Sequence, residues 1–142
     1  MSINVLLVDD EEDFRESLGK RLRVRRLVVR TAESGEAALR ILQEHAVDVV
    51  VLDVRMPGMS GLAAMQAIKL SHPLVEIILL TGHASLDASR EGMALGAFDY
   101  LLKPTKIDDL IYKIEDAYSR KSEQEKKIRR LHAAKDRWGG DD

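Results

Sequence analysis

Short, uninterrupted apolar runs alternate along this chain with longer segments whose apolar residues repeat at helical spacing. We predict strands at the apolar runs, which are residues 3–8, 27–31, 47–52, 77–80 and 99–102. Runs that are apolar on both faces are typical of a parallel sheet, because helices cover both of its sides. The alternation therefore predicts an α/β fold in which βα units surround a five-stranded parallel sheet.

The segments between these runs carry the apolar stripes of helices. The first three stripes are Phe14, Leu18 and Leu22, then Ala38, Leu39, Ile41 and Leu42, then Leu62, Met65 and Ile68. Ser60 can cap the third helix, and Gly96 follows a fourth as a helix-terminating glycine would. The last helix has the clearest period, over residues 107–117, with Thr105 or Asp108 as its possible cap.

Composition excludes several classes of protein. The chain has no cysteine, which rules out disulfides and thiolate metal sites. No apolar stretch is long enough to span a bilayer, and the start lacks the basic segment of a signal sequence. We therefore expect a cytoplasmic protein that does not contact the membrane. The net charge of −2 gives no indication of direct nucleic-acid binding.

The two signs of charge are distributed unevenly along the chain. Acidic residues are in excess before Ser119, whereas Lys and Arg outnumber Asp and Glu from that residue onward. This change of composition is the only domain boundary that we predict. It separates a folded domain at 1–118 from a basic helical extension or linker tail at 119–142.

A weak heptad pattern continues from the last helix into this tail. One seam position holds Ile107, Ile114, Lys121, Ile128 and Lys135, and the other holds Leu110, Ala117, Gln124, Leu131 and Trp138. The apolar members favour a coiled-coil homodimer, whereas Lys121 and Gln124 interrupt the seam. A dimer stem and a solvated, partly frayed tail both remain open.

Polar side chains fall where the predicted strands end. Asp9 and Asp10 end the first strand, Asp53 the third, Thr81 the fourth and Lys103 the fifth. Ligands of a parallel α/β sheet bind at the carboxyl ends of its strands. We therefore expect these carboxylates, the hydroxyl and the ammonium to meet at a single edge of the sheet.

Such a group of side chains fits phosphoryl transfer. Crowded carboxylates repel one another unless a cation lies among them, and oxygen ligands suit Mg²⁺. A metal ion, a lysine and a hydroxyl together can neutralise and position a phosphoryl group. A carboxylate can be the nucleophile in this reaction, forming an aspartyl-phosphate.

Four sequence blocks resemble the signatures of the response-regulator receiver family, within the CheY-like superfamily. They are LLVDDE, VVLDVRMPGMSG, ILLTGHAS and GAFDYLLKP, and the resemblance covers about residues 3–118. It implies a flavodoxin-like, doubly wound (βα)5 domain, here with an extended C-terminal helix. The tripeptide at 81–83 and the block GAFDYL are similar to receivers of NtrC-type transcription activators.

The resemblance implies a role for each acidic residue. Asp53 would be the phosphoacceptor, and Asp10 and Asp53 would ligate Mg²⁺ directly. Asp9 would act mainly through a water molecule. The backbone carbonyl of Arg55 would complete the ligands that the protein provides.

It also implies the residues that respond to phosphorylation. Lys103 would pair with the phosphoryl group, Thr81 would hydrogen-bond to it, and Tyr100 would be the aromatic switch residue. The side chains of Arg55 and His83 flank the site and could tune the lifetime of the phosphorylated state, or be plain loop residues.

The loops around these residues have backbone features of their own. Pro57, Gly58 and Gly61 would shape the loop after the phosphoacceptor, where they allow a tight turn. The family also implies a cis peptide bond between Lys103 and Pro104. Residue 105 is a threonine where the family usually has an aromatic or aliphatic side chain.

We accordingly predict a signalling switch, not an enzyme, with intrinsic self-phosphorylation and dephosphorylation capacity. A sensor histidine kinase or phosphotransfer protein would donate the phosphoryl group, and the face of the fourth helix, fifth strand and fifth helix would contact a downstream protein. The alternative is the receiver part of a larger DNA-binding transcription regulator. An aspartyl-phosphate phosphatase is a third hypothesis, but Arg55 stands where such enzymes need a second acid.

Overall fold

The structure of the chain is a computed structural model that describes residues 2–82 and 86–138. Strands and helices alternate along these residues, as the apolar pattern predicts. The strands are β1 (Asn4–Val8), β2 (Val28–Ala32), β3 (Val49–Asp53), β4 (Glu76–Thr81) and β5 (Asp99–Leu102). The helices are α1 (Glu12–Val24), α2 (Gly35–Glu44), α3 (Gly61–Ser71), α4 (Leu86–Ala94) and α5 (Ile107–Arg137).

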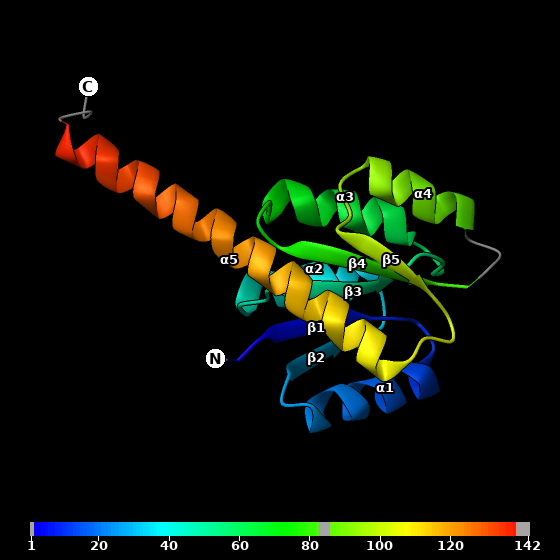
Figure 1. Cartoon of the computed structure of the whole chain (residues 1–142). Coiled ribbons are helices and arrows are strands. Elements are labelled where there is room, and N and C mark those ends of the chain that lie inside the picture. The colour runs from blue at the N-terminus through cyan, green and yellow to red at the C-terminus, as the bar shows by residue number, and fades with distance from the viewer. Residues whose placement is uncertain (1, 83–85, 139–142) are drawn as a thin grey trace.

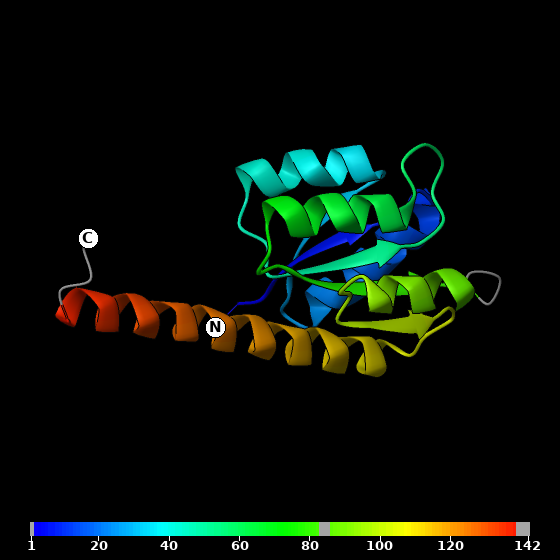
Figure 2. The same ribbon diagram turned by 90° about the horizontal axis from the view of Figure 1, so that it is seen from above.

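All five strands are parallel and form one sheet in the order β2-β1-β3-β4-β5. Helices cover both of its faces (Figures 1 and 2), so that α1 and α5 pack on one side and α2, α3 and α4 on the other. Alternate residues of β1 show the division, because Leu6 belongs to the core under α2 and α3, and Leu7 to the core under α1 and α5. The predicted five-stranded, flavodoxin-like doubly wound fold is confirmed.

The predicted strands agree with the structure to within two residues at each end. The largest difference is at β3, which begins at Val49 and not at residue 47. Asp48 lies just before it and accepts a hydrogen bond from the Asn4 N–H through its side chain, at 2.8 Å. At the other end the strand includes Asp53, so the phosphoacceptor candidate is itself held in the sheet ladder.

Two of the predicted helix ends are confirmed and one is wrong. The Ser60 side chain accepts a hydrogen bond from the Ala63 N–H at 3.2 Å, and Gly96, after α4, has φ +112°. Neither Thr105 nor Asp108 caps α5, because the helix begins at Ile107 and the residue at its N-cap is Lys106, whose side chain makes no capping bond. Asp108 lies instead in the first turn, where its charge is favourable to the helix dipole.

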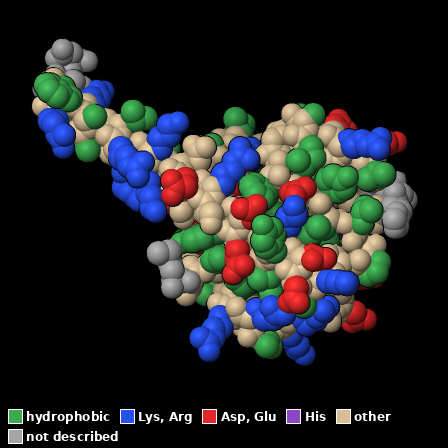
Figure 3. Space-filling view, viewed as in Figure 1, with side chains coloured by type: hydrophobic (Ala, Val, Ile, Leu, Met, Phe, Trp, Pro, Cys, Tyr) green, Lys and Arg blue, Asp and Glu red, His purple; other side chains and the backbone are tan. Residues whose placement is uncertain are grey.

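Helix α5 is a single helix of 31 residues that continues well beyond the body of the domain (Figures 1 and 2). Its first half buries Leu110, Ile114 and Ala117 against the sheet. From residue 126 to residue 138 every side chain is exposed, and Lys and Arg gather along this projecting part (Figure 3). None of the helices in the described part of the chain combines the length and apolarity needed to cross a membrane.

Candidate functional site

Three carboxylates meet at the carboxyl edge of the sheet. Val8 of β1 pairs with Leu52 of β3, so Asp9, which follows β1, lies beside Asp53, the last residue of β3. Asp10 joins them, and one carboxylate oxygen of each of the three residues lies within 4.8 Å of the others. Asp9 and Asp53 are buried, whereas Asp10 is exposed. The cluster is therefore partly buried and partly exposed, with Asp10 as its exposed member.

Backbone N–H groups hold two of these carboxylates in place. The Glu11 N–H donates to Asp9 Oδ1 at 2.9 Å, and the Arg55 N–H donates to Asp53 Oδ1 at 3.4 Å. In both loops the donor lies two residues after the acceptor, so the same tight turn serves each strand end. Arg15 adds a third contact, because its guanidinium donates to the Asp9 carbonyl at 2.9 Å.

Lys103 enters the site from the end of β5. Its Nζ lies 2.9 Å from Asp9 Oδ2 and 3.9 Å from Asp53 Oδ1. Its backbone N–H donates to the Thr81 carbonyl at 2.7 Å, which ties the loop after β5 to the end of β4. The peptide bond between Lys103 and Pro104 is cis, in agreement with the resemblance. The ammonium therefore lies between the two buried carboxylates.

The balance of charges acts on Asp53. Burial, followed by the charge of Asp9, raises the pKa of Asp53 from its ordinary value of 3.8 to about 6. Lys103 and the Arg55 N–H act in the opposite direction, and Asp10 adds a small further rise. Three carboxylates and one ammonium leave an excess of negative charge at the site. The side-chain atoms that could ligate a metal ion are all carboxylate oxygens. This donor set fits a hard divalent cation such as Mg²⁺.

Thr81 and Tyr100 lie in the neighbouring strands. Thr81 is the last residue of β4 and is fully buried, with its hydroxyl 3.4 Å from the Gly82 carbonyl. Asp53 pairs with Leu80, so Thr81 is one residue further along the edge. Tyr100 is half-buried in β5 and packs against the core under α2, α3 and α4.

Arg55 and His83 are the two residues that could tune the reaction rate. The Arg55 side chain is exposed, two residues beyond Asp53. His83 lies outside the described residues. The Arg55 backbone N–H contacts the site through its hydrogen bond to Asp53.

Gly61 explains how the loop after β3 returns to the site. A Cβ atom at this position would lie 2.2 Å from the Asp53 carbonyl oxygen and 2.6 Å from Val54 Cα. The Gly61 N–H donates to the Val54 carbonyl at 2.9 Å. The start of α3 therefore packs directly on the backbone of the phosphoacceptor candidate, and no side chain fits between them. Gly58, in the same loop, has φ +76°, which glycine adopts easily.

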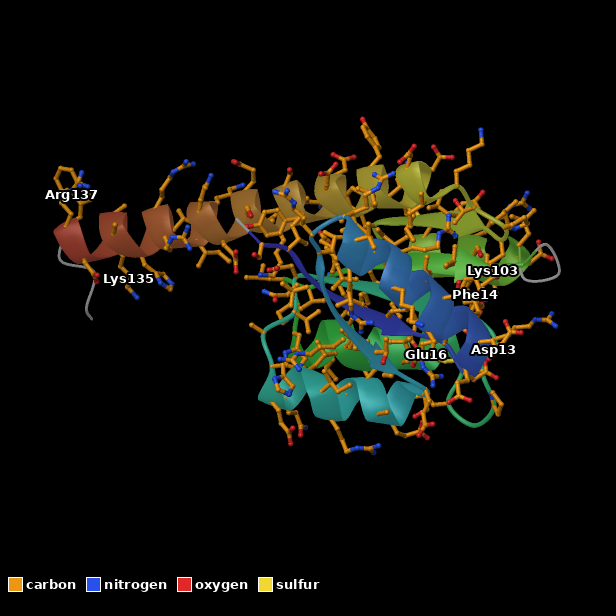
Figure 4. All side chains as sticks on the ribbon, turned by 90° about the horizontal axis from the view of Figure 1, so that it is seen from below. Asp13, Phe14, Glu16, Lys103, Lys135 and Arg137 are labelled. Atoms are coloured by element: carbon orange, nitrogen blue, oxygen red, sulfur yellow. The ribbon has the colours of Figure 1, made fainter. Side chains whose placement is uncertain are left out.

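Phe14 lies at the site, although its position in the sequence did not predict this. Its ring lies under Lys103, with the Nζ atom 4.2 Å from the ring centroid (Figure 4). Phe14 fits the apolar stripe of α1, and this spacing predicts only a core contact. The available signal was its place in the first turn after β1, next to the strand end that carries Asp9.

A cavity of about 410 Å³ lies at the opposite edge of the sheet, near the amino ends of β3 and β4. Its lining includes His45, Asp48, His72 and Lys121. Because Asp9, Asp53 and Lys103 lie at the carboxyl ends of the strands, this cavity takes no part in the carboxylate site.

The chain is similar in sequence and in fold to known proteins. The DNA-binding transcriptional regulator NtrC of Escherichia coli is 40% identical over 121 residues, which are 85% of this chain and 26% of NtrC. A receiver domain protein from Clostridium thermocellum is 37% identical with a TM-score of 0.81, covering 84% of this chain and 97% of that one. NtrX from Brucella abortus is 30% identical with a TM-score of 0.84, and the match covers 89% of this chain and 29% of NtrX.

The chain thus spans about a quarter of the length of the curated relatives it matches. The predicted likeness to receivers of NtrC-type activators is confirmed by these relatives. A sequence model described as "Response regulator receiver domain" matches residues 5–115. The chain belongs to the response regulator receiver domain family.

Proposed function

We propose that Asp53 is the phosphoacceptor of a two-component phosphorelay, and that a sensor histidine kinase or a phosphotransfer protein is the donor. The observation that carries this proposal is the position of Asp53 among Asp9, Asp10 and Lys103, with the ammonium 3.9 Å from its Oδ1. Membership of the receiver family supports the same role. Phosphorylation would then switch protein contacts, as expected of a signalling protein and not of a metabolic enzyme.

In the transfer step, an Asp53 carboxylate oxygen attacks the phosphorus of a phosphohistidine. A P–O bond forms, the P–N bond breaks, and its electron pair leaves with the imidazole nitrogen. Asp53 must be ionised to attack, and with a pKa of about 6 it is mostly ionised at pH 7. Because acyl phosphates offer a similar leaving group, the same carboxylate would support self-phosphorylation from small donors.

Mg²⁺, held by Asp9, Asp10, Asp53 and the backbone carbonyl of Arg55, would offset the charge of the carboxylates and of the phosphoryl oxygens. Lys103 presents its ammonium to the phosphoryl oxygens, and the Thr81 hydroxyl donates to one of them once the transfer is complete. The side chains of Arg55 and His83 would control the approach of water that hydrolyses the product.

The signal would leave the site through Thr81 and Tyr100. Movement of Thr81 toward the phosphoryl group would make room for the Tyr100 ring to turn inward, which shifts an existing equilibrium of the domain. The downstream protein would contact the face formed by α4, β5 and α5. Residues 1–118 form the receiver in this scheme, and 119–142 are a helical extension.

A second candidate function concerns the whole protein. NtrC carries the description of a DNA-binding transcriptional regulator, and this chain matches only a quarter of it. The chain would then be the receiver part of a larger regulator, and the projecting part of α5 would connect it to the output domain or form a homodimer stem.

Acetyl phosphate and mass spectrometry test the phosphoacceptor directly. Incubation with acetyl phosphate and Mg²⁺ is expected to add a single phosphoryl group, and chelation of the metal is expected to prevent it. Asp53→Asn should abolish the addition, because the amide is not a nucleophile. Asp136→Asn, in the exposed projecting helix, is the matched control and should behave as the unmodified chain. Full phosphorylation of the Asp53→Asn protein would contradict the assignment.

A further inference from the structure

Lys103 has two kinds of partner in the structure. Two of its contacts are with carboxylates, Asp9 at 2.9 Å and Asp53 at 3.9 Å. The third is with the face of the Phe14 ring, whose centroid lies 4.2 Å from Nζ. This last distance is well within the range of a cation–π interaction. The lysine side chain as a whole is also largely removed from water, because only 24% of it is exposed.

Phe14 is well placed to hold a fixed position. It lies in the first turn of α1, which begins soon after β1 ends, and its half-buried ring packs against the core under α1 and α5. Leu18, one turn further along the same face, is buried in that core. Figure 4 shows Phe14 and Lys103 close together, although they come from opposite ends of the domain sequence. The ring therefore packs on one side of the ammonium and is held there by its contacts with the core.

The two kinds of partner have different effects on the lysine. Asp9 draws Nζ toward β1, and a carboxylate this close neutralises the charge that a phosphoryl group would need. An aromatic ring attracts the ammonium through its quadrupole but carries no net charge. Contact with the ring therefore stabilises Lys103 at the site and leaves its charge available to another anion. An aliphatic side chain in the same place would fill the space without this attraction.

We propose that Phe14 is a positioning residue for Lys103, and that its ring holds the ammonium where it can meet the phosphoryl group on Asp53. The inference rests on the proposed role of Asp53 as phosphoacceptor. Phe14 does not touch the reacting atoms and acts only through the lysine. A residue that serves merely as core packing would show no dependence on Lys103.

The test compares rates of Asp53 phosphorylation by acetyl phosphate, at saturating Mg²⁺, in variants of the full chain. Phe14→Leu keeps an apolar side chain but removes the ring, and it should lower the second-order rate constant about 3- to 10-fold. Phe14→Tyr keeps the ring and should restore the rate to within about 2-fold of the unmodified chain. Equal rates for the Leu variant and the unmodified chain would overturn the proposal.

A double-mutant cycle separates positioning from packing. In a Lys103→Met background the ring has no ammonium to hold, so Phe14→Leu should change the residual rate by less than about 2-fold. The same 3- to 10-fold loss, about what the single variant shows, would mean that Phe14 acts independently of the lysine and would overturn the proposal.

Pentafluorophenylalanine at position 14 keeps the assay decisive if Phe14→Leu fails to fold. This residue preserves the shape of the ring but removes the negative face that attracts the ammonium. The rate is expected to fall by the same factor as in the Leu variant, and an unchanged rate would again overturn the proposal. Failure of the proposed function is distinct, because the unmodified chain would then gain no phosphoryl group or Asp53→Asn would still gain one.

Discussion

At the scale of the residue, Asp53 is a group whose native environment opposes its charge. Burial and the Asp9 carboxylate raise its pKa from 3.8 to about 6, so the native state binds a proton more tightly than the unfolded chain. Below about pH 4 the carboxyl group is protonated in the native and in the unfolded state, so it does not lower the free energy of unfolding. As the pH rises through 6, the native state must carry a buried carboxylate, and stability is lost.

We therefore expect Asp53→Asn to stabilise the metal-free protein. At pH 7.5 the free energy of unfolding should increase by about 1 to 3 kcal/mol, because the amide has no charge to bury. The gain should shrink as the pH falls through 6 and disappear near pH 4. Urea denaturation at a series of pH values measures it. Saturating Mg²⁺ is the control, since a cation among the carboxylates should narrow the difference, and a gain independent of pH would contradict the explanation.

Individual residues differ in how far the sequence reveals them. Asp9, Asp53 and Thr81 could be located because each lies where an apolar run stops, and parallel strands bring their carboxyl ends to one edge. Phe14 could not, because its spacing is that of an ordinary core residue and its contact depends on where Lys103 returns to the sheet. The approach of Gly61 to the backbone of Asp53 depends likewise on the path of the loop.

At the scale of the element, ion pairs fix α5 to the body of the domain at the point where it leaves the core. Lys121 Nζ lies 3.1 Å from Asp48 Oδ1 and 2.9 Å from Glu125 Oε2. Burial lowers the pKa of Lys121, but hydrogen bonds to Glu125 and Asp48 more than compensate and raise it above its ordinary value. Asp48 in turn accepts the Asn4 N–H bond, so a single network joins β1, the start of β3 and α5.

Lys121→Met should destabilise the protein by about 1 to 2 kcal/mol, because Asp48 would keep its partly buried charge without this partner. Lys126→Met is the matched control on the same helix. Lys126 pairs with Glu123 at 3.7 Å, but both side chains are largely exposed, so a change of less than about 0.5 kcal/mol is expected there. Chemical denaturation of the two variants at pH 7 compares them, and equal losses would show that the network at Asp48 contributes nothing special.

Element ends were harder to predict than the elements themselves. The strands were predicted to within two residues, because a short run that is apolar on both faces is typical of a buried strand in an α/β domain. The cap of α5 was predicted wrongly, because a candidate side chain such as Asp108 can equally serve inside the first turn. The residue at which a helix begins depends on single hydrogen bonds, and apolar periodicity does not predict these.

At the scale of the whole molecule, the two ends of the sheet have different roles. The carboxyl edge holds the candidate phosphoacceptor, and the amino edge holds the network that anchors α5. The helix therefore connects the part of the domain beside β5 to a projecting segment whose side chains are all exposed. Residues 126–137 of that segment contain six Lys and Arg residues and one Asp. The overall fold could be predicted from the apolar pattern. Only a weak heptad pattern indicated that α5 extends beyond the domain.

The apolar heptad residues of the projecting part favour a homodimer, whereas its positive charges oppose one. The dependence of association on salt concentration distinguishes the two effects. Ile128, Leu131 and Trp138 are exposed apolar side chains in the projecting part, and a stem would bury them. The neighbouring cations would repel those of a second copy, over a distance that salt shortens. We therefore expect sedimentation equilibrium to show association that strengthens between 50 mM and 500 mM salt, about as the screening length falls. Leu131→Asp should abolish it, whereas Leu70→Asp, at an exposed site on α3, should not. A monomer at every salt concentration would contradict the dimer stem.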